Sequence, residues 1–142
     1  MKTIRCTRIV GGKGEGRALV SKEAISFLGG CDLRTGVVIE EGHALYGESI
    51  AGTVLIFPEG KGSTVGSFSL YVMAKRGVAP KAIINIRRDS IVIIGGIISG
   101  IPIVDGCDSN PLEAIRTGDM VEVDADNGRV TIWDTDATDQ HQ

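Results

Sequence analysis

The sequence predicts a β-rich α/β domain whose sheet is partly closed like a barrel and carries one main helix. Three observations support this fold class. Many short β-branched runs are separated by glycines, which number 20 of 142 residues; helix signals occur at only two places; and the apolar residues, 42% of the chain, are aliphatic, since aromatics make up only 4%. A chain of this length buries about two-thirds of its unfolded surface, which suits one core. We therefore expect residues 1–133 to form a single domain.

The amino-terminal half reads as short strands joined by turns. Residues 3–10 mix β-branched and basic side chains and predict a first strand. Residues 11–16 predict a glycine-rich turn, whose spacing lacks the third glycine of a dinucleotide-binding fingerprint. Residues 17–20 predict a second strand. Two further short strands are expected at 26–28 and 37–40, each before a glycine or acidic turn.

A buried strand followed by a helix is the clearest element pair in the sequence. Residues 53–57 form a continuous apolar run before Pro58, as expected of a strand covered on both faces. Residues 64–76 then predict a helix with Ser63 as N-cap and Gly77 after the last turn. The apolar side chains on one face of this helix are Val65, Phe68, Val72 and Met73.

The remaining elements complete the sheet. Residues 82–86 and 91–97 predict two more buried strands, and the first completes a β–loop–α–β unit with a right-handed crossover. Asn110 before Pro111 predicts the start of a short helix that ends at Gly118. Residues 120–124 and 129–133 alternate apolar and polar side chains, which predicts a closing hairpin with Asn127-Gly128 as its tight turn.

Cysteine usage and charge exclude several classes of protein. Cys6, Cys31 and Cys107 are odd in number and far apart, which predicts free buried thiols in a reducing cytoplasm and no zinc or iron–sulfur site held by this chain. The amino terminus does not resemble a signal peptide, and residues 91–98 are too short to span a bilayer. A net charge of −3 argues against a nucleic-acid partner or a polybasic membrane surface. Residues 134–142 are expected to be an acidic, disordered tail.

The strongest chemical signal is the loop Gly60-Lys61-Gly62-Ser63-Thr64 between the buried strand and the helix. Glycines let backbone N–H groups approach a ligand, and the start of a helix carries roughly half a positive charge. Lys61 adds a full charge, so the loop suits a phosphate, a carboxylate or a developing oxyanion. It is not a P-loop, because the lysine precedes the second glycine. An ordinary glycine turn with a serine N-cap is the alternative.

Three other features are weaker. His43 lies between glycines, which is typical of a turn or surface residue, although an active-site acid is an alternative. Cys107 lies beside two aspartates, which disfavour a reactive thiolate. Arg87-Arg88 follows a predicted strand and is either a solvated loop or a clamp for an anion or a partner's carboxylate. Because no complete catalytic set emerges, the domain is expected to supply one part of a shared site.

Several segments together resemble the small subunit of the aconitase X family. The similarity runs from the first strand to about Trp133 and is most specific in SFLGG (26–30), HALYGESIAG (43–52), FPEGKGSTVGS (57–67) and GVAPKAII (77–84). The resemblance implies a swivelling β/β/α domain, as in the mobile domain of aconitases. It also implies a separate large catalytic subunit that carries a [4Fe-4S] cluster through its own cysteines.

The resemblance further implies the loss of water from (R)-5-phosphomevalonate, a small phosphorylated hydroxy acid, giving trans-anhydromevalonate 5-phosphate in an archaeal route to isoprenoids. Ser63 matches the family serine and is the expected proton acceptor, with Gly62, Thr64 and Lys61 as candidate substrate-binding residues. Two alternatives stay open. One is an aconitase X dehydratase with another substrate, such as cis-3-hydroxy-L-proline, and the other is a non-catalytic anion-binding module.

Overall fold

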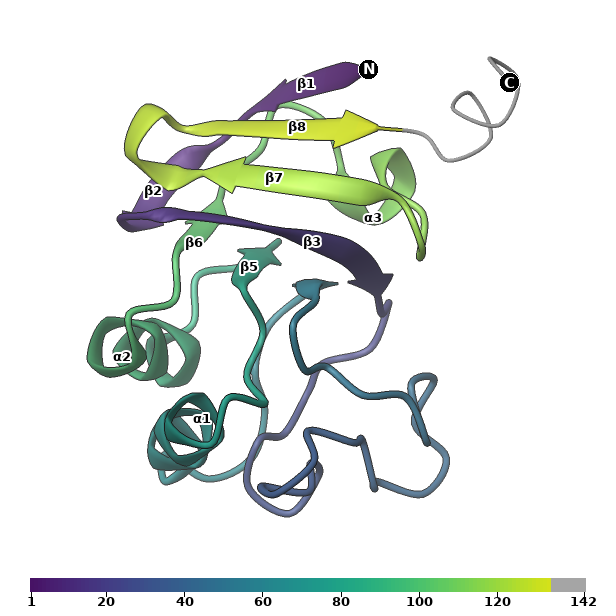
Figure 1. The fold of residues 1–142 in the computed structure, drawn as a ribbon, viewed down its shortest axis with the longest axis vertical. Helices are drawn as coiled ribbons and strands as arrows, with labels where there is room; N and C mark the ends of the chain where they lie inside the picture. The colour runs from purple at the N-terminus through teal and green to yellow at the C-terminus, as the bar shows by residue number, and fades with distance from the viewer. Residues whose placement is uncertain (134–142) are drawn as a thin grey trace.

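The computed structural model describes residues 1–133, so the predicted acidic tail at 134–142 lies outside the described residues. Within residues 1–133, eight strands form one sheet in the order β1-β8-β7-β3-β4-β5-β6-β2 (Figure 1). Their bounds are β1 Lys2–Arg5, β2 Thr7–Val10, β3 Lys13–Val20, β4 Val54–Phe57, β5 Ala82–Asn85, β6 Ile103–Asp105, β7 Met120–Asp124 and β8 Arg129–Trp133. The predicted strands at 53–57 and 82–86 and the hairpin at 120–133 are confirmed.

The centre of the sheet is parallel and buried on both faces. Strands β3, β4, β5 and β6 run parallel to one another, and all four residues of β4 are fully buried. Alternate side chains enter two separate cores: Leu55 and Phe57 face the helices, whereas Val54 and Ile56 face the strands that fold over the other side. This arrangement explains why 53–57 reads as an unbroken apolar run rather than an alternating one.

The glycine-rich segment at 11–16 is largely a strand, so the prediction of a turn there is wrong. β3 begins at Lys13 and carries Gly14 and Gly16 past the starts of β5 and β4 at the amino edge of the parallel strands. A β-carbon at Gly16 would lie 2.6 Å from the carbonyl oxygen of Gly52. These glycines therefore permit close contact between backbones rather than a change of direction.

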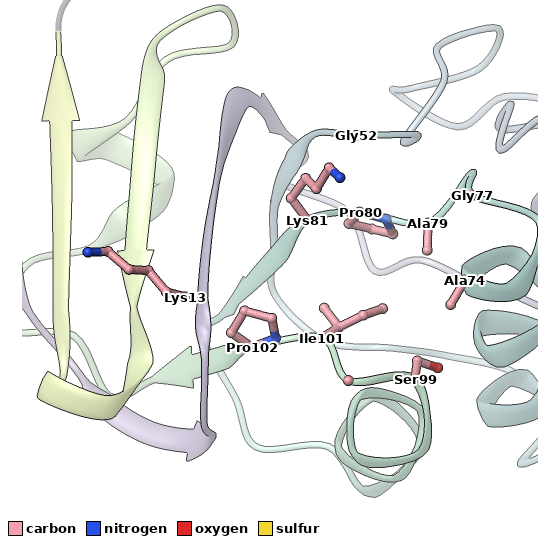
Figure 2. Close-up of a pocket in the computed structure, with 11 residues that line it drawn as sticks. Lys13, Gly52, Ala74, Gly77, Ala79, Pro80, Lys81, Ser99, Ile101 and Pro102 are labelled. Atoms are coloured by element: carbon pink, nitrogen blue, oxygen red, sulfur yellow. The ribbon is translucent and has the colours of Figure 1, made fainter.

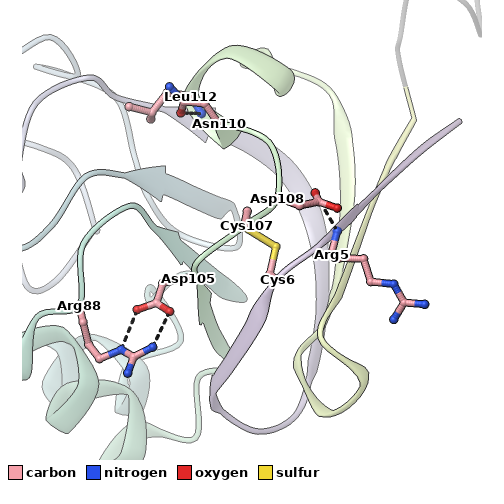
Figure 3. The surroundings of a disulfide bond; sticks show 8 residues. All are labelled: Arg5, Cys6, Arg88, Asp105, Cys107, Asp108, Asn110 and Leu112. Atoms are coloured by element: carbon pink, nitrogen blue, oxygen red, sulfur yellow. Dashed lines mark hydrogen bonds and ion pairs between the residues drawn. A yellow bond between two sulfur atoms is a disulfide. The ribbon is translucent and has the colours of Figure 1, made fainter.

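The two end strands meet at a seam that nearly closes the sheet. The predicted strand at 3–10 breaks at Cys6 into β1, which pairs with β8, and β2, which pairs with β6. Cys6 forms a disulfide with Cys107, and the Arg5 backbone N–H donates to the Asp108 carboxylate at 3.2 Å (Figure 3). The prediction of free thiols is wrong for this pair, because a separation of 101 residues hides their proximity, and it is confirmed for Cys31.

Helix α1, Gly66–Lys75, lies beside the parallel strands, but its buried face differs from the predicted one. Val65 and Phe68 are exposed, whereas Leu70 and Met73 are fully buried together with Gly66, Ser67 and Ser69. Small residues face inward because a second helix packs closely at this point. Gly77 has the positive φ of +75° expected after a helix end, which confirms that prediction.

The second helix, α2 at Ser90–Ser99, replaces the strand predicted at 91–97, so two ten-residue helices are present instead of one main helix. The Asp89 carboxylate accepts from the Ile91 N–H at 2.8 Å, and Gly100 ends the helix with φ +71°. Gly95 and Gly96 let the helix approach Leu70 and Ile103. A short apolar run does not distinguish a strand from a buried helix, and for this reason the run at 91–97 wrongly predicted a strand.

The remaining segments are short. Helix α3, Pro111–Ala114, starts at Asn110 as predicted but ends before Gly118. The hairpin connection is a 3-10 turn, η1 at Ala125–Asn127, closed by Gly128, and is longer than the predicted two-residue turn. The strands predicted at 26–28 and 37–40 are irregular loop with isolated bridges at Ile25, Val37 and Val38.

Asp124, at the end of β7, predicts a specific acid sensitivity. The Asn127 side-chain amide donates to its carboxylate at 2.9 Å and lowers its pKa below the ordinary value of 3.8, with Lys13 and Arg129 acting in the same direction. This stabilisation is therefore present above about pH 4 and is lost as the pH falls through the lowered pKa of the folded state. In urea titrations, we expect the stability gap between wild type and Asp124→Asn to shrink from about pH 5 to about pH 3. A gap that does not change with pH would contradict this assignment.

Candidate active-site loop

The loops at the carboxyl edge of the parallel strands bring the candidate residues together. Residues 58–65 follow β4 and residues 86–89 follow β5, so both loops leave the same edge of the sheet. The first loop is also tied to an earlier segment through the backbone. The Lys61 N–H donates to the Ile25 carbonyl at 3.0 Å, and the Ile25 N–H donates to the Glu59 carbonyl at 3.2 Å. This edge is where open parallel sheets place their ligands.

Ser63 is exposed at the turn that leads into α1. Its Oγ accepts a hydrogen bond from the backbone N–H of Val65 at 3.1 Å, and its carbonyl accepts from the Gly66 N–H at 2.9 Å. The helix begins at Gly66 rather than at Thr64, so Ser63 starts the turn that leads into the helix, three residues before Gly66, and does not cap the helix as predicted. An N–H aimed at Oγ stabilises an alkoxide more than a neutral hydroxyl, because the charged acceptor binds more strongly.

Gly62 holds the loop in a conformation that other residues rarely adopt. Its φ is +91°, and a β-carbon at this position would lie 2.9 Å from the Oγ of Ser26. The Ser26 hydroxyl in turn donates to the Leu28 carbonyl at 2.7 Å. A side chain at position 62 is therefore disfavoured both by the backbone and by this neighbour.

The cations at this edge are each held by a carboxylate. Lys61 Nζ lies 2.7 Å from Glu40 Oε2, so part of the charge expected of Lys61 is offset. Arg87 Nε donates to Glu59 at 2.9 Å and keeps a largely exposed side chain at the same edge. Sequence reasoning assigned no role to these two glutamates, although Glu59 lies within the FPEGKGSTVGS segment (57–67).

Arg88 separates from Arg87 and takes a structural role. It donates from Nε and Nη2 to the two carboxylate oxygens of Asp105 at 3.1 and 3.0 Å (Figure 3). The hydrogen bond to Asp105 raises the pKa of the guanidinium. The two arginines therefore do not act together as a clamp.

Thr64 lines a hollow between α1 and α2. This hollow has a volume of about 320 Å³ and is lined by Thr64, Ser67, Phe68, Ser90, Ile91, Ile94 and Ile98. Its polar end adjoins the candidate loop, and its other end is apolar. A hollow of about 330 Å³ lies at the opposite edge of the sheet, where Lys81, Ser99 and Pro102 are among its lining (Figure 2), and contains none of the candidate residues.

His43 is a buried structural residue rather than a surface turn. Its Nδ1 accepts from the Leu45 N–H at 3.0 Å, and its Nε2 lies 2.9 Å from the Ala24 carbonyl oxygen. These partners fix the neutral tautomer with the proton on Nε2, because one nitrogen must accept while the other donates. His43 thus fastens the loop of residues 41–47 to the segment before Ile25.

The cysteines of this chain do not suit a metal cluster. Cys31 is buried, and its burial raises the pKa of the thiol to about 12, with Glu40 acting in the same direction. Because iron–sulfur clusters need several converging thiolates, the disulfide between Cys6 and Cys107 removes the other two candidates. Within residues 1–133, no group of three or more His, Cys, Asp or Glu side chains is placed to hold a metal ion. None of the helices formed by these residues is long and apolar enough to cross a membrane.

A curled sheet with a parallel centre, two helices on one side and a glycine–serine loop at its carboxyl edge defines a swivelling β/β/α domain. Residues 3–132 match the family described as the aconitase X swivel domain. The chain belongs to this family, which confirms the fold expected from the resemblance.

Relatives of nearly the same length support this membership. The chain is 59% identical over 129 residues to the phosphomevalonate dehydratase small subunit of Methanocella arvoryzae, covering 91% of this chain and 98% of the relative. It is 51% identical over 127 residues to the protein of the same name from Archaeoglobus fulgidus, covering 89% and 96%. The crystal structure of Thermococcus kodakaraensis aconitase X in its holo-form superimposes with a TM-score of 0.88 at 48% identity, covering 94% of this chain and all of that chain.

Proposed function

We propose that this chain is the small subunit of a heterodimeric hydro-lyase that dehydrates (R)-5-phosphomevalonate and is active only with its large subunit. The observation that carries the proposal is the full-length similarity to phosphomevalonate dehydratase small subunits, together with an exposed Ser63 in the glycine-rich loop. In this assignment Ser63 is the proton acceptor, Gly62 and Thr64 bind the substrate, and Lys61 supports the charge of the loop.

The reaction requires a base at a carbon beside a carboxylate. Ser63, as an alkoxide, takes the proton from this carbon, the C–H electron pair becomes the new double bond, and the neighbouring C–O bond breaks with the hydroxyl leaving as hydroxide. The hydroxide takes up a proton from solvent and leaves as water, and the Ser63 hydroxyl returns its proton to solvent, which restores the alkoxide. A serine alkoxide is unstable in water, so it needs preorganised donors. The Val65 N–H at 3.1 Å and the positive end of α1 supply this stabilisation within the chain.

The large subunit would have to supply what this chain lacks. A metal ion acts as a Lewis acid on a leaving hydroxyl, and the family implies an iron–sulfur cluster for this purpose. Since the cysteines here do not fit a cluster, we assign it to the large subunit. The residues of this chain contribute the base, the backbone donors and one wall of the pocket.

Reconstitution tests the proposal directly. We expect no turnover of (R)-5-phosphomevalonate by either purified subunit alone and turnover when both are mixed, because each carries only part of the site. Mass spectrometry should detect a product lighter by one water. Activity on cis-3-hydroxy-L-proline instead would assign the pair to another aconitase X dehydratase. Tight binding of phosphomevalonate to the isolated small chain in calorimetry, without turnover in the mixture, would favour the anion-binding module.

A further inference from the structure

The outer face of the helix pair α1–α2, whose one charged side chain is Lys75 at the end of α1, is the feature of this fold that the proposed catalysis does not use. Of the nine exposed large apolar side chains within residues 1–133, four lie on α1 and α2: Phe68, Ile94, Ile97 and Ile98. We call these four residues the α1–α2 apolar surface. Ile94 is 51% exposed and Ile97 is 61% exposed. Isolated exposed apolar residues are ordinary, but a contiguous group marks a surface that binds something.

The sequence of α2 strengthens this point. Its ten residues, SIVIIGGIIS, contain no charged side chain, and a helix that is apolar all round is normally buried on all sides. Here Val92, Gly95 and Gly96 face the core, whereas Ile94, Ile97 and Ile98 face outward on one side at three- and four-residue spacing. The exposed side of α2 therefore has the apolar composition that is normal for a helix side covered by another surface.

The apolar surface is continuous with the candidate site. One hollow is lined both by Thr64, which belongs to the glycine–serine loop, and by Phe68, Ile94 and Ile98. A second hollow joins Phe68, Tyr71 and Ile98 farther along the helices. A chain that completes the pocket at Ser63 and Thr64 is thus positioned to continue along this surface.

The geometry points to the large subunit as the occupant: we propose that it docks on the α1–α2 apolar surface with aliphatic and aromatic side chains while its catalytic face covers Ser63. This inference rests on the proposed function, because that function supplies the partner. The segment 134–142 is an unsuitable occupant, since its sequence, DTDATDQHQ, contains no large apolar side chain. A second copy of this chain could cover the hollow at Thr64, but it would not bring the catalytic groups that the proposed function assigns to the large subunit.

Charge substitution on the helices tests the docking surface by affinity rather than turnover. We expect Ile94→Glu with Ile98→Glu to weaken binding to the purified large subunit at least about 100-fold in calorimetry, because both charges would be desolvated at the interface. Phe68→Ala is expected to weaken it about tenfold or more. Thr3→Glu, an exposed change on β1 far along the sheet, should bind like wild type. Circular dichroism melting of each isolated variant checks that it is folded.

The outcomes separate the two proposals. Wild-type affinity in the folded Ile94→Glu, Ile98→Glu variant would overturn the docking surface and leave the proposed function intact. A wild-type chain that does not bind the large subunit would overturn the proposed function. If the isolated chain is a dimer that these substitutions dissociate, with affinity for the large subunit unchanged, the occupant is a second copy and the docking proposal fails.

Discussion

Ser63→Ala is expected to lower kcat of the reconstituted enzyme by about 10²- to 10⁴-fold, the range typical of removing a general base. Folding and binding to the large subunit should stay at wild-type levels, because the Ser63 side chain is exposed and, among residues 1–133, its one hydrogen bond is from the Val65 N–H. Single-turnover kinetics with (R)-5-phosphomevalonate measures the chemical step, and calorimetry measures assembly. Turnover near the wild-type rate would remove Ser63 from its proposed role.

A companion variant tests the backbone donor separately. Val65→Pro keeps a φ close to the observed −63° but deletes the N–H that donates to Ser63 Oγ. If that donor stabilises the alkoxide, kcat should fall by about 10²- to 10³-fold while assembly is retained. A fall in kcat in Ser63→Ala without a fall in Val65→Pro would mean that the donors to the alkoxide lie elsewhere, with the large subunit as the remaining source.

Phe57→Ala is expected to cost about 3–5 kcal/mol in the free energy of unfolding, the range for removing a buried aromatic side chain. Phe57 is fully buried on β4 and meets Phe27 edge-on with ring centroids 5.9 Å apart. Because small domains are stable by about 5–15 kcal/mol, a loss of this size is a large fraction of the total. Urea titration of the isolated chain measures it.

Phe68→Ala is the matched control, since it deletes the same atoms from an exposed position. Phe68 is 65% exposed and contacts Tyr71 within α1. Its removal should change the free energy of unfolding by less than about 0.5 kcal/mol, while it weakens binding to the large subunit as inferred above. Equal destabilisation by both substitutions would contradict the assignment of Phe68 to an outer surface.

The candidate loop was predictable because its signal is local. Glycines on both sides of Lys61 between a buried strand and a helix already indicate an anion site, and the resemblance adds the role of Ser63. The carboxylate partners of the cations were not predictable. Glu40 reaches Lys61 across 21 residues, and Glu59 reaches Arg87 across 28, so only the packing of the loops at one sheet edge brings them together.

The sequence by itself determined the buried central strands, the closing hairpin, the start of α3 at Asn110 and the glycine after α1, because periodicity and capping depend on neighbouring residues. The tertiary structure alone decided that residues 90–99 form a helix, that Leu70 rather than Phe68 faces inward, and that Cys6 meets Cys107. Each of these outcomes depends on which distant surface packs against the segment. A run of isoleucines suits a strand and a buried helix equally, and the close packing of Gly95 against Leu70 and of Gly96 against Ile103 is present only in the folded chain.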